Sequence, residues 1–160
     1  MAEIYNTFPN RLVEGTSADD SIDNNAINVT ISAGEGNDTI WNGADSVTVD
    51  GGEGEDLIDN ANPKTSVSIN AGAGNDTIWN HASDTTINAG DGNDTLHSMV
   101  GEKVLMLGGK GDDTVWNEFA NSTIDSGDGN DNIDNRADNV SINGGEGDNY
   151  IWNGDPYLDA

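Results

Sequence analysis

A nine-residue phrase returns seven times in this chain of 160 residues, and its spacing constrains the fold more than any other feature. The copies begin at Ala33, Gly51, Ala71, Ala89, Gly108, Ser126 and Gly144, so that successive starts lie 18, 20, 18, 19, 18 and 18 residues apart. A fixed period of this length is typical of solenoids, in which each repeat is one turn that stacks on its neighbours. The sequence therefore predicts a stack of turns.

Each phrase has the same internal chemistry. Its second and fourth places are always glycine, its sixth place is aspartate or asparagine, and its eighth place is apolar. Two glycines one residue apart allow positive φ angles and a close approach of backbone carbonyl groups. A carboxylate two residues after the second glycine adds negative charge at the same point. A loop that offers only oxygen ligands favours a hard cation such as Ca²⁺.

The phrases AGAGNDTIW from Ala71 and AGDGNDTLH from Ala89 resemble the nonapeptide GGxGxDxUx of the RTX family, the hemolysin-type calcium-binding repeats of secreted bacterial proteins. The resemblance covers about 140 of the 160 residues. It implies an all-β fold, a right-handed parallel β-roll or β-solenoid, in which each calcium lies between the loops of neighbouring turns. It also implies secretion by a type I system to the extracellular space, with attachment to the cell surface as a variant.

By position, the resemblance assigns calcium binding to the glycine loops and the sixth-place aspartates. The aspartates are Asp38, Asp56, Asp76, Asp94, Asp113 and Asp131. The loop glycines are Gly34, Gly36, Gly52, Gly54, Gly72, Gly74, Gly90, Gly92, Gly109, Gly111, Gly127 and Gly129. These loops imply about five strong sites, and up to about seven if two incomplete copies contribute.

The two incomplete copies lie at the ends of the array. The last copy has Asn149 at the sixth place and an acid one residue earlier, so we expect a weak site or none among Gly145, Gly147, Asp148 and Asn149. An earlier copy from Gly15 to Asp23 keeps Asp20, but Thr16 and Ala18 stand at its glycine places. We expect this copy to act as an end cap.

The other half of each turn lacks the two glycines, so we expect one row of calcium ions along one edge only. The opposite edge carries one asparagine per turn, with a gap at Ser98. We expect the stacked amides to form a ladder of hydrogen bonds from turn to turn. The ladder would comprise Asn6, Asn24, Asn42, Asn60, Asn80, Asn117, Asn135 and Asn153.

The predicted core is narrow. Period-two alternation places Ile40, Ile58, Ile78, Leu96, Val115, Ile133 and Ile151 inward, opposite Ile31, Val49, Ile69, Ile87, Met106, Ile124 and Ile142. Apolar burial is small for a chain with 33% hydrophobic residues and 21 glycines, and its 30 acids against 5 bases give a net charge of −25. We therefore expect an expanded chain without cations, which folds when calcium cross-links the turns.

We expect three segments along the chain. Residues 1–14 would form an N-terminal half-turn or cap, residues 15–153 the roll, and residues 154–160 a C-terminal tail, as in a piece of a longer protein. A bulge at 62–64 would interrupt one half-turn. The chain has no cysteine, no apolar stretch long enough to span a bilayer, and no basic start followed by an apolar run. Its acidity excludes nucleic acid as a partner.

One outward position of the first strand in each turn alternates between aromatic and polar residues, reading Tyr5, Asp23, Trp41, Asp59, Trp79, His97, Trp116, Asp134 and Trp152. We call this row the aromatic stripe. Its four tryptophans, Trp41, Trp79, Trp116 and Trp152, are candidates for a docking surface that binds a glycan or a partner protein, as in an adhesin. Alternatively, each ring shields the neighbouring strand, or the period records duplication of a two-turn unit. Further turns or copies could also stack end to end.

The outward positions of the second strand carry Thr and Ser with Asn and Asp, which leaves an ice-binding face as a third alternative. Leu105 and Leu107 interrupt these ranks. Catalysis is not expected, because His81 and His97 lie in different half-turns and no nucleophile converges on either. The sequence thus predicts a calcium-binding structural or binding module and no enzyme.

Overall fold

The computed structural model describes residues 1–61, 66–99 and 102–154. The described residues form strands, turns and bends, with no helix among them, so none of them provides a helix that could cross a membrane. The predicted bulge at 62–64 and residues 155–160 of the predicted tail lie outside the described residues. Within 1–14, the expected cap contributes one strand to each of two sheets.

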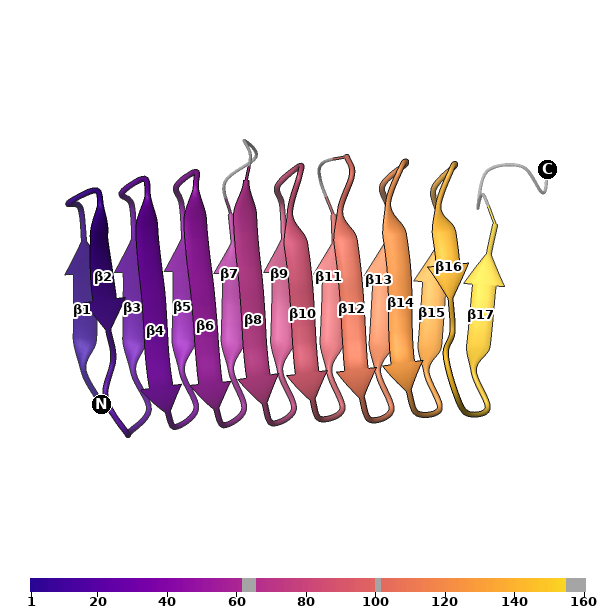
Figure 1. Cartoon of the computed structure of the whole chain (residues 1–160), viewed down its shortest axis with the longest axis horizontal. Helices are drawn as coiled ribbons and strands as arrows, with labels where there is room; N and C mark the ends of the chain where they lie inside the picture. The colour runs from indigo at the N-terminus through magenta and orange to yellow at the C-terminus, as the bar shows by residue number, and fades with distance from the viewer. Residues whose placement is uncertain (62–65, 100–101, 155–160) are drawn as a thin grey trace.

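Two parallel sheets lie face to face, and successive strands of the chain belong alternately to one sheet and to the other, as Figure 1 shows. Sheet A has nine strands in the order of the odd labels: β1 (Glu3–Asn6), β3 (Ser21–Asn24), β5 (Thr39–Asn42), β7 (Leu57–Asn60), β9 (Thr77–Asn80), β11 (Thr95–Ser98), β13 (Thr114–Asn117), β15 (Asn132–Asn135) and β17 (Tyr150–Asn153). Sheet B has eight strands in the order of the even labels: β2 (Arg11–Glu14), β4 (Val29–Glu35), β6 (Val47–Glu53), β8 (Val67–Ala73), β10 (Thr86–Asp91), β12 (Leu105–Lys110), β14 (Thr123–Asp128) and β16 (Ser141–Asn143). The chain is therefore a β-solenoid of about eight turns, as the repeat predicts.

The strands pair without register slips. In sheet A, Ile40 lies opposite Ile22 and Ile58, and in sheet B, Ile69 lies opposite Val49 and Ile87. A slip of one residue would turn every apolar side chain outward, so the alternation of apolar and polar residues fixes this register. The bends that lead from sheet B to sheet A are short because they contain glycines. The bends that lead from sheet A to sheet B are short because each contains a residue in the left-handed conformation.

The left-handed residues were not predicted. One stands one or two residues before each strand of sheet B, with φ between 49° and 66°: Asn10, Asn28, Ser46, Ser66, Asp84, Lys103, Asn121 and Asn139. Asn and Asp tolerate this conformation better than other residues that carry a Cβ. Asn or Asp therefore helps the chain to turn into sheet B at five of these eight positions.

The core lies between the sheets and is built on two facing rows of apolar side chains. Ile22, Ile40, Ile58 and the residues aligned with them up to Ile133 are fully buried, opposite a second buried row from Val13 to Ile124. At the C-terminal end the predicted core is less buried than expected: Ile142 packs against the core but is only partly buried, and Ile151 is 44% exposed. The sequence repeat alone does not reveal this, because it treats β17 like the inner strands, whereas no further described strand pairs with β17.

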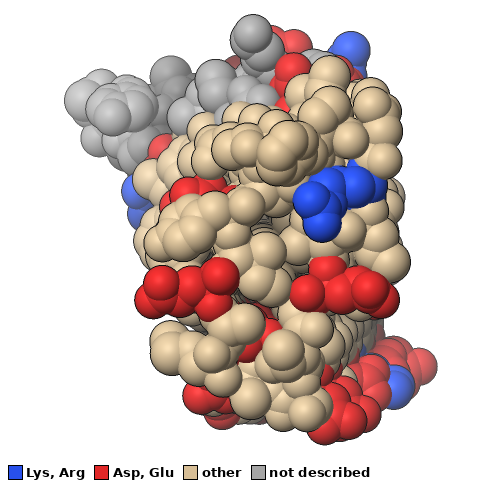
Figure 2. Space-filling view, turned by 90° about the vertical axis from the view of Figure 1, so that its left-hand side faces the viewer, with Lys and Arg blue, Asp and Glu red and all other residues tan. Residues whose placement is uncertain are grey.

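The two edges of the solenoid differ in chemistry. The glycine loops join each strand of sheet B to the next strand of sheet A along the lower edge of Figure 1, and the asparagine bends lie along the upper edge. Figure 2 views the molecule from the end that bears β1. Most of its Asp and Glu patches lie in the lower half, on the side of the glycine loops. This edge is where the candidate ligands gather.

Candidate metal-binding loops

The glycine loops stack on one another in register. The second-place glycine of each copy pairs with that of the next turn, from Gly34 through Gly52, Gly72, Gly90 and Gly109 to Gly127. Their φ angles lie between 99° and 121°, in the region that glycine alone adopts readily. The first three residues of each of these phrases therefore belong to sheet B, and only the next few residues form the bend.

Side chains are excluded from the inside of this stack. A Cβ built on Gly52 would lie 1.9 Å from the carbonyl oxygen of Gly34, and one built on Gly72 would lie 2.1 Å from that of Gly52. The fourth-place glycines are equally constrained, with a Cβ on Gly74 only 2.0 Å from the carbonyl oxygen of Gly54. The carbonyl oxygen of one turn thus occupies the space that a side chain on the next turn would need.

The sixth-place aspartates all use one carboxylate oxygen in the same way. The backbone N–H of Asp38 donates to Oδ1 of Asp56 at 2.8 Å, and that of Asp56 donates to Oδ1 of Asp76 at 2.8 Å. The pattern continues through Asp94, Asp113 and Asp131. Each carboxylate is therefore fixed by the turn before it, and its Oδ2 is left for another partner.

That second oxygen has no partner in any complete copy. Oδ2 is buried and accepts no hydrogen bond in Asp38, Asp56, Asp76, Asp94, Asp113 and Asp131. These are the six predicted ligands. Buried polar atoms nearly always have a partner, and a buried charge without one is costly. Six orphaned oxygens in a row point to a group that the protein chain does not itself supply.

The incomplete copies show what Oδ2 lacks. In the last copy Asn149 accepts the bond from Asp131 through Oδ1, and its Nδ2, which stands in place of Oδ2, donates to the carbonyl oxygen of Gly144 at 2.6 Å. In the first copy Oδ2 of Asp20 accepts from the N–H and the hydroxyl of Thr16, at 2.6 and 2.8 Å. Both end loops contain their own hydrogen-bond donors, whereas the six complete loops do not.

Burial and repulsion from nearby carboxylates raise the pKa values of Asp38, Asp56, Asp76, Asp94 and Asp113. Burial raises the pKa of Asp56 and Asp94 to about 6 and that of Asp76 and Asp113 to about 7, with a further contribution from neighbouring carboxylates. The hydrogen bond from the backbone opposes the increase in each case. At Asp20 burial also acts to raise the pKa, but the hydrogen bonds from Ala2 and Thr16 outweigh it and the pKa is lowered.

The donor set fits a hard cation. The orphaned atoms are carboxylate oxygens, and the loops around them present backbone carbonyl groups and no nitrogen or sulfur ligand. The described residues contain no group of three or more acidic, histidine or cysteine side chains that could hold a metal on its own. A cation in these loops must therefore take part of its coordination from the backbone.

The loops contain a second ladder of hydrogen bonds, which was not predicted from the sequence. The fifth-place side chain of one turn accepts a hydrogen bond from the backbone of the next, as in Glu55 N–H to Oδ1 of Asn37 at 2.9 Å and Asp112 N–H to Oδ1 of Asn93 at 2.8 Å. The fifth-place acid Asp148 is exposed, and its N–H donates to Asn130. The frequent Asn or Asp at this place was a signal that could have revealed this ladder.

The predicted asparagine ladder at the opposite edge is confirmed. Nδ2 of each asparagine donates to Oδ1 of the next at 2.7 to 2.9 Å, from Asn6 to Asn80 and again from Asn117 to Asn153. The predicted gap at Ser98 is also present, with a buried Oγ that has no hydrogen-bond partner. The edge away from the glycine loops is therefore held by amides.

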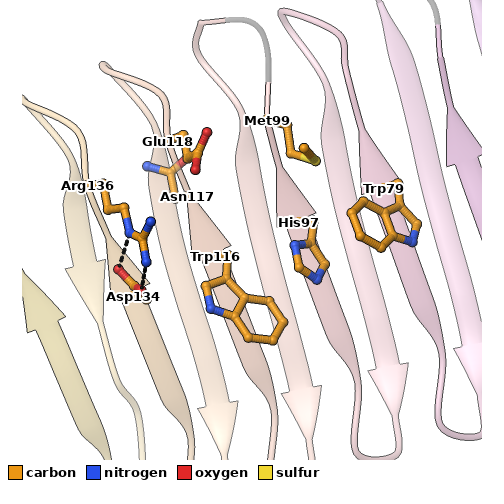
Figure 3. Close-up of a pocket in the computed structure, with 8 residues that line it drawn as sticks. All are labelled: Trp79, His97, Met99, Trp116, Asn117, Glu118, Asp134 and Arg136. Carbon is orange, nitrogen blue, oxygen red and sulfur yellow. Dashed lines mark hydrogen bonds and ion pairs between the residues drawn. The ribbon is translucent and has the colours of Figure 1, made fainter. Parts of the chain in front are cut away.

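The aromatic stripe also lies where it was predicted, on the outward face of sheet A and in register from Tyr5 to Trp152. Its central residues form a stack that the sequence did not reveal. The ring of His97 lies between those of Trp79 and Trp116, with centroids 4.1 and 4.2 Å apart (Figure 3). Trp41 is 42% exposed.

Comparison with known families agrees with the loop geometry. The model of the RTX calcium-binding nonapeptide repeat matches in four copies, over residues 14–49, 68–96 and 80–101. The copies that begin at Gly51, Gly108, Ser126 and Gly144 lie outside these ranges, although the first three stack in the same register. No match was found among curated proteins or solved structures.

Proposed function

Since this chain belongs to the RTX calcium-binding repeat family, we propose that it is a secreted module that folds into its solenoid when Ca²⁺ fills the glycine loops. The observation that carries the proposal is the row of six buried Oδ2 atoms without a hydrogen-bond partner. Cations between the turns would compensate these charges. Protein oxygen atoms are the ligands that calcium prefers.

The residues that would hold the ions are the six aspartates from Asp38 to Asp131 and the carbonyl groups of their loops. We expect about five ions, one between each pair of successive aspartates. Bound calcium supplies positive charge that bridges neighbouring turns. The chain supplies the rest: the backbone N–H groups orient the carboxylates through Oδ1, and the glycines keep side chains out of the loops.

Charge explains why folding would depend on the ions. About five divalent ions would reduce the formal charge of −25 to about −15 and would place positive charge beside the most crowded carboxylates. A site that exists only in the folded state adds its binding free energy to folding, about 2.7 kcal/mol per site when calcium is at 100 times the dissociation constant. The narrow apolar core alone contributes little to the free energy of folding.

The direct test is a calcium titration of protein stripped with EDTA. Far-ultraviolet circular dichroism should show a cooperative gain of β structure, and calorimetry should give about five ions per chain. Magnesium serves as the control, because it demands a stricter octahedral geometry and gives up its water reluctantly. Full β structure after exhaustive chelation would contradict the proposal.

The aromatic stripe supports a second role, a docking surface like that of an adhesin. Two adjoining cavities of about 250 and 460 Å³ lie on this face, and both are lined by Trp116, Asp134 and Arg136. Exposed aromatic rings beside polar groups are common at binding surfaces. The ranks of the ice-binding alternative are instead bonded to one another, as in Asn70 to Asp50 at 2.9 Å, and Leu105 and Leu107 interrupt them.

A further inference from the structure

The aromatic stripe is closed at its centre and hollowed on the side towards β17. The ring of His97 on β11 stacks on Trp79 and Trp116, so one face of the Trp116 indole is covered. Trp116 lies on β13, between β11 and β15, so its opposite face is directed to β15. The cavity of about 460 Å³ lies on this side and is also lined by Trp152 of β17. The indole of Trp116 thus forms one wall of a cavity and is supported from behind by His97.

Aromatic rings and polar side chains share the lining of this cavity. Its aromatic residues are Trp116, Tyr150 and Trp152, and its polar residues are Asn132, Asp134 and Arg136. Asn132 lies opposite Tyr150, and Asp134 lies opposite Trp152, on the neighbouring strands β15 and β17. Aromatic walls with a few polar groups are typical of small-ligand sites, whose volumes are about 300–1,000 Å³. The cavity therefore has the size and the composition of such a site.

The charged groups of the cavity neutralise each other. Arg136 donates through Nε to Oδ1 of Asp134 at 3.1 Å and through Nη2 to Oδ2 at 2.8 Å, as Figure 3 shows. Solvent reaches both partners, because 22% of the Asp134 side chain and 45% of the Arg136 side chain are exposed. Each carboxylate oxygen can accept a further hydrogen bond, since an ionised carboxylate has about four acceptor positions. The cavity thus presents accessible acceptors without requiring a charged ligand.

Building on the docking role proposed for the aromatic stripe, we propose that this cavity binds a neutral oligosaccharide made of pyranose rings. The C–H face of a pyranose packs on aromatic rings, and its hydroxyl groups both donate and accept hydrogen bonds. Trp116 and Trp152 would pack against the sugar. Asp134 would accept hydrogen bonds from its hydroxyl groups, and the amide of Asn132 would both donate and accept. The lining matches both kinds of surface that one sugar ring presents.

The charge and the polar groups argue against other ligands. The net charge of −25 repels acidic glycans. A basic peptide would be attracted by that charge, but Asp134 already has a counter-ion in Arg136. An apolar side chain would displace water from Asp134, Arg136 and Asn132 without replacing its hydrogen bonds, which is costly. A neutral sugar replaces those hydrogen bonds and still packs on the rings.

The second cavity on this face indicates a ligand longer than one sugar. It has a volume of about 250 Å³, extends from the first cavity towards Trp79 and Met99, and shares Trp116, Asp134 and Arg136 with it. An oligosaccharide that occupies the larger cavity can therefore continue past the ion pair into the smaller one. We expect affinity to increase from a monosaccharide to a tetrasaccharide.

The test uses the full chain in saturating calcium, so that its outcome is separate from that of calcium-dependent folding. The neutral probes are glucose, cellotetraose, maltotetraose and chitotetraose, and tetragalacturonate is the acidic control of equal length. Each is titrated while tryptophan fluorescence and heat are recorded. We expect at least one neutral tetrasaccharide to bind about tenfold or more tightly than glucose and than tetragalacturonate.

Variants locate the site within the stripe. Trp152→Ala should weaken binding of that tetrasaccharide about tenfold or more, and Asn132→Ala, at an exposed position, about threefold or more. Trp41→Ala is the matched control, because Trp41 belongs to the same stripe but lines neither cavity, and it should change binding less than about twofold. Circular dichroism in calcium confirms that each variant is folded.

Two results would overturn the proposed ligand class: no binding by any neutral tetrasaccharide, or binding of tetragalacturonate as tight as that of the neutral probes. A third result would overturn the proposed position. If Trp41→Ala abolished sugar binding while Trp152→Ala and Asn132→Ala left it unchanged, the stripe would keep a docking role, but this cavity would not be its site.

Discussion

At the residue scale, the decisive atom of each glycine loop is Oδ2 of the sixth-place aspartate. Asn149 shows that one nitrogen in its place is enough to satisfy the loop without an ion, through a bond of 2.6 Å to the carbonyl group of Gly144. In the end loops the atom at this position therefore has a hydrogen-bond partner within the protein, whereas in the complete loops it has none. The complete loops require an external cation or a proton.

This contrast predicts the effect of Asp76→Asn. The amide should keep the bond from Asp56 through Oδ1 and should place a donor where Oδ2 now has no partner. We expect the calcium-free solenoid to gain about 1–3 kcal/mol, the usual cost of an unsatisfied buried group, while the protein binds fewer ions. Circular dichroism in EDTA, which reports any gain of β structure in the calcium-free chain, and calorimetric ion counting in calcium measure both effects. Asp76→Ala is the matched control, and an equal gain from alanine would contradict the explanation.

The raised pKa values predict a pH dependence with opposite signs in the two states. In the calcium-free protein, the folded pKa values of about 6 to 7 at Asp56, Asp76 and Asp113 exceed the unfolded value of 3.8, so the folded state binds more protons in this range. The penalty for folding is absent below pH 4 and complete above pH 7. Lowering the pH from 7.5 to 5 should therefore increase β structure in EDTA.

In the presence of calcium the same protons compete with the ions. The apparent dissociation constant for calcium should rise as the pH falls from 7.5 to 5, because bound carboxylates must be ionised. Circular dichroism in EDTA and calcium titrations at several pH values test the pair of effects. If acid removed β structure from the calcium-free chain at pH 5, the inferred role of the buried aspartates would be wrong.

At the scale of the element, the asparagine ladder holds the edge that lacks candidate ligands. Asn42 accepts from Asn24 and donates to Asn60 and to the carbonyl group of Ala44. Asn42→Ala leaves an amide donor and an amide acceptor buried without partners, so we expect a loss of about 2–4 kcal/mol. Chemical denaturation in saturating calcium measures the loss. Asn132→Ala, at an exposed outward position, should cost less than about 0.5 kcal/mol.

Sequence periodicity predicted this ladder and the strand register because both recur from turn to turn, with Ser98 as the gap in the ladder. It could not predict features that occur once. The stack of His97 on its neighbouring tryptophans and the ion pair between Arg136 and Asp134 depend on side-chain conformation. The exposure of Ile151 depends on its place in the last described turn. The structure places the predicted ligands in one row. Only its hydrogen bonds show that one oxygen of each carboxylate has no partner.

At the scale of the whole molecule, each turn contacts its neighbours in the stack, so position should decide the effect of losing a ligand. Asp94 lies between loops with orphaned oxygens on both sides, whereas the carboxylate of Asp20 is satisfied by Thr16. We expect Asp94→Ala to raise the calcium concentration at half-folding about tenfold or more, equivalent to at least about 1.4 kcal/mol. Asp20→Ala should change it less than threefold. Circular dichroism titrations compare the two, and equal shifts would show that the end loop also binds an ion.

The donors at the two end loops have a consequence for stoichiometry. Thr16 and Asn149 close the row with bonds made within the protein, so neither end leaves an oxygen that invites one more ion. Ion uptake should then level off at a fixed number however much calcium is added. Duplicating one internal turn should raise that plateau by one, which would make the length of the array a count of its ions.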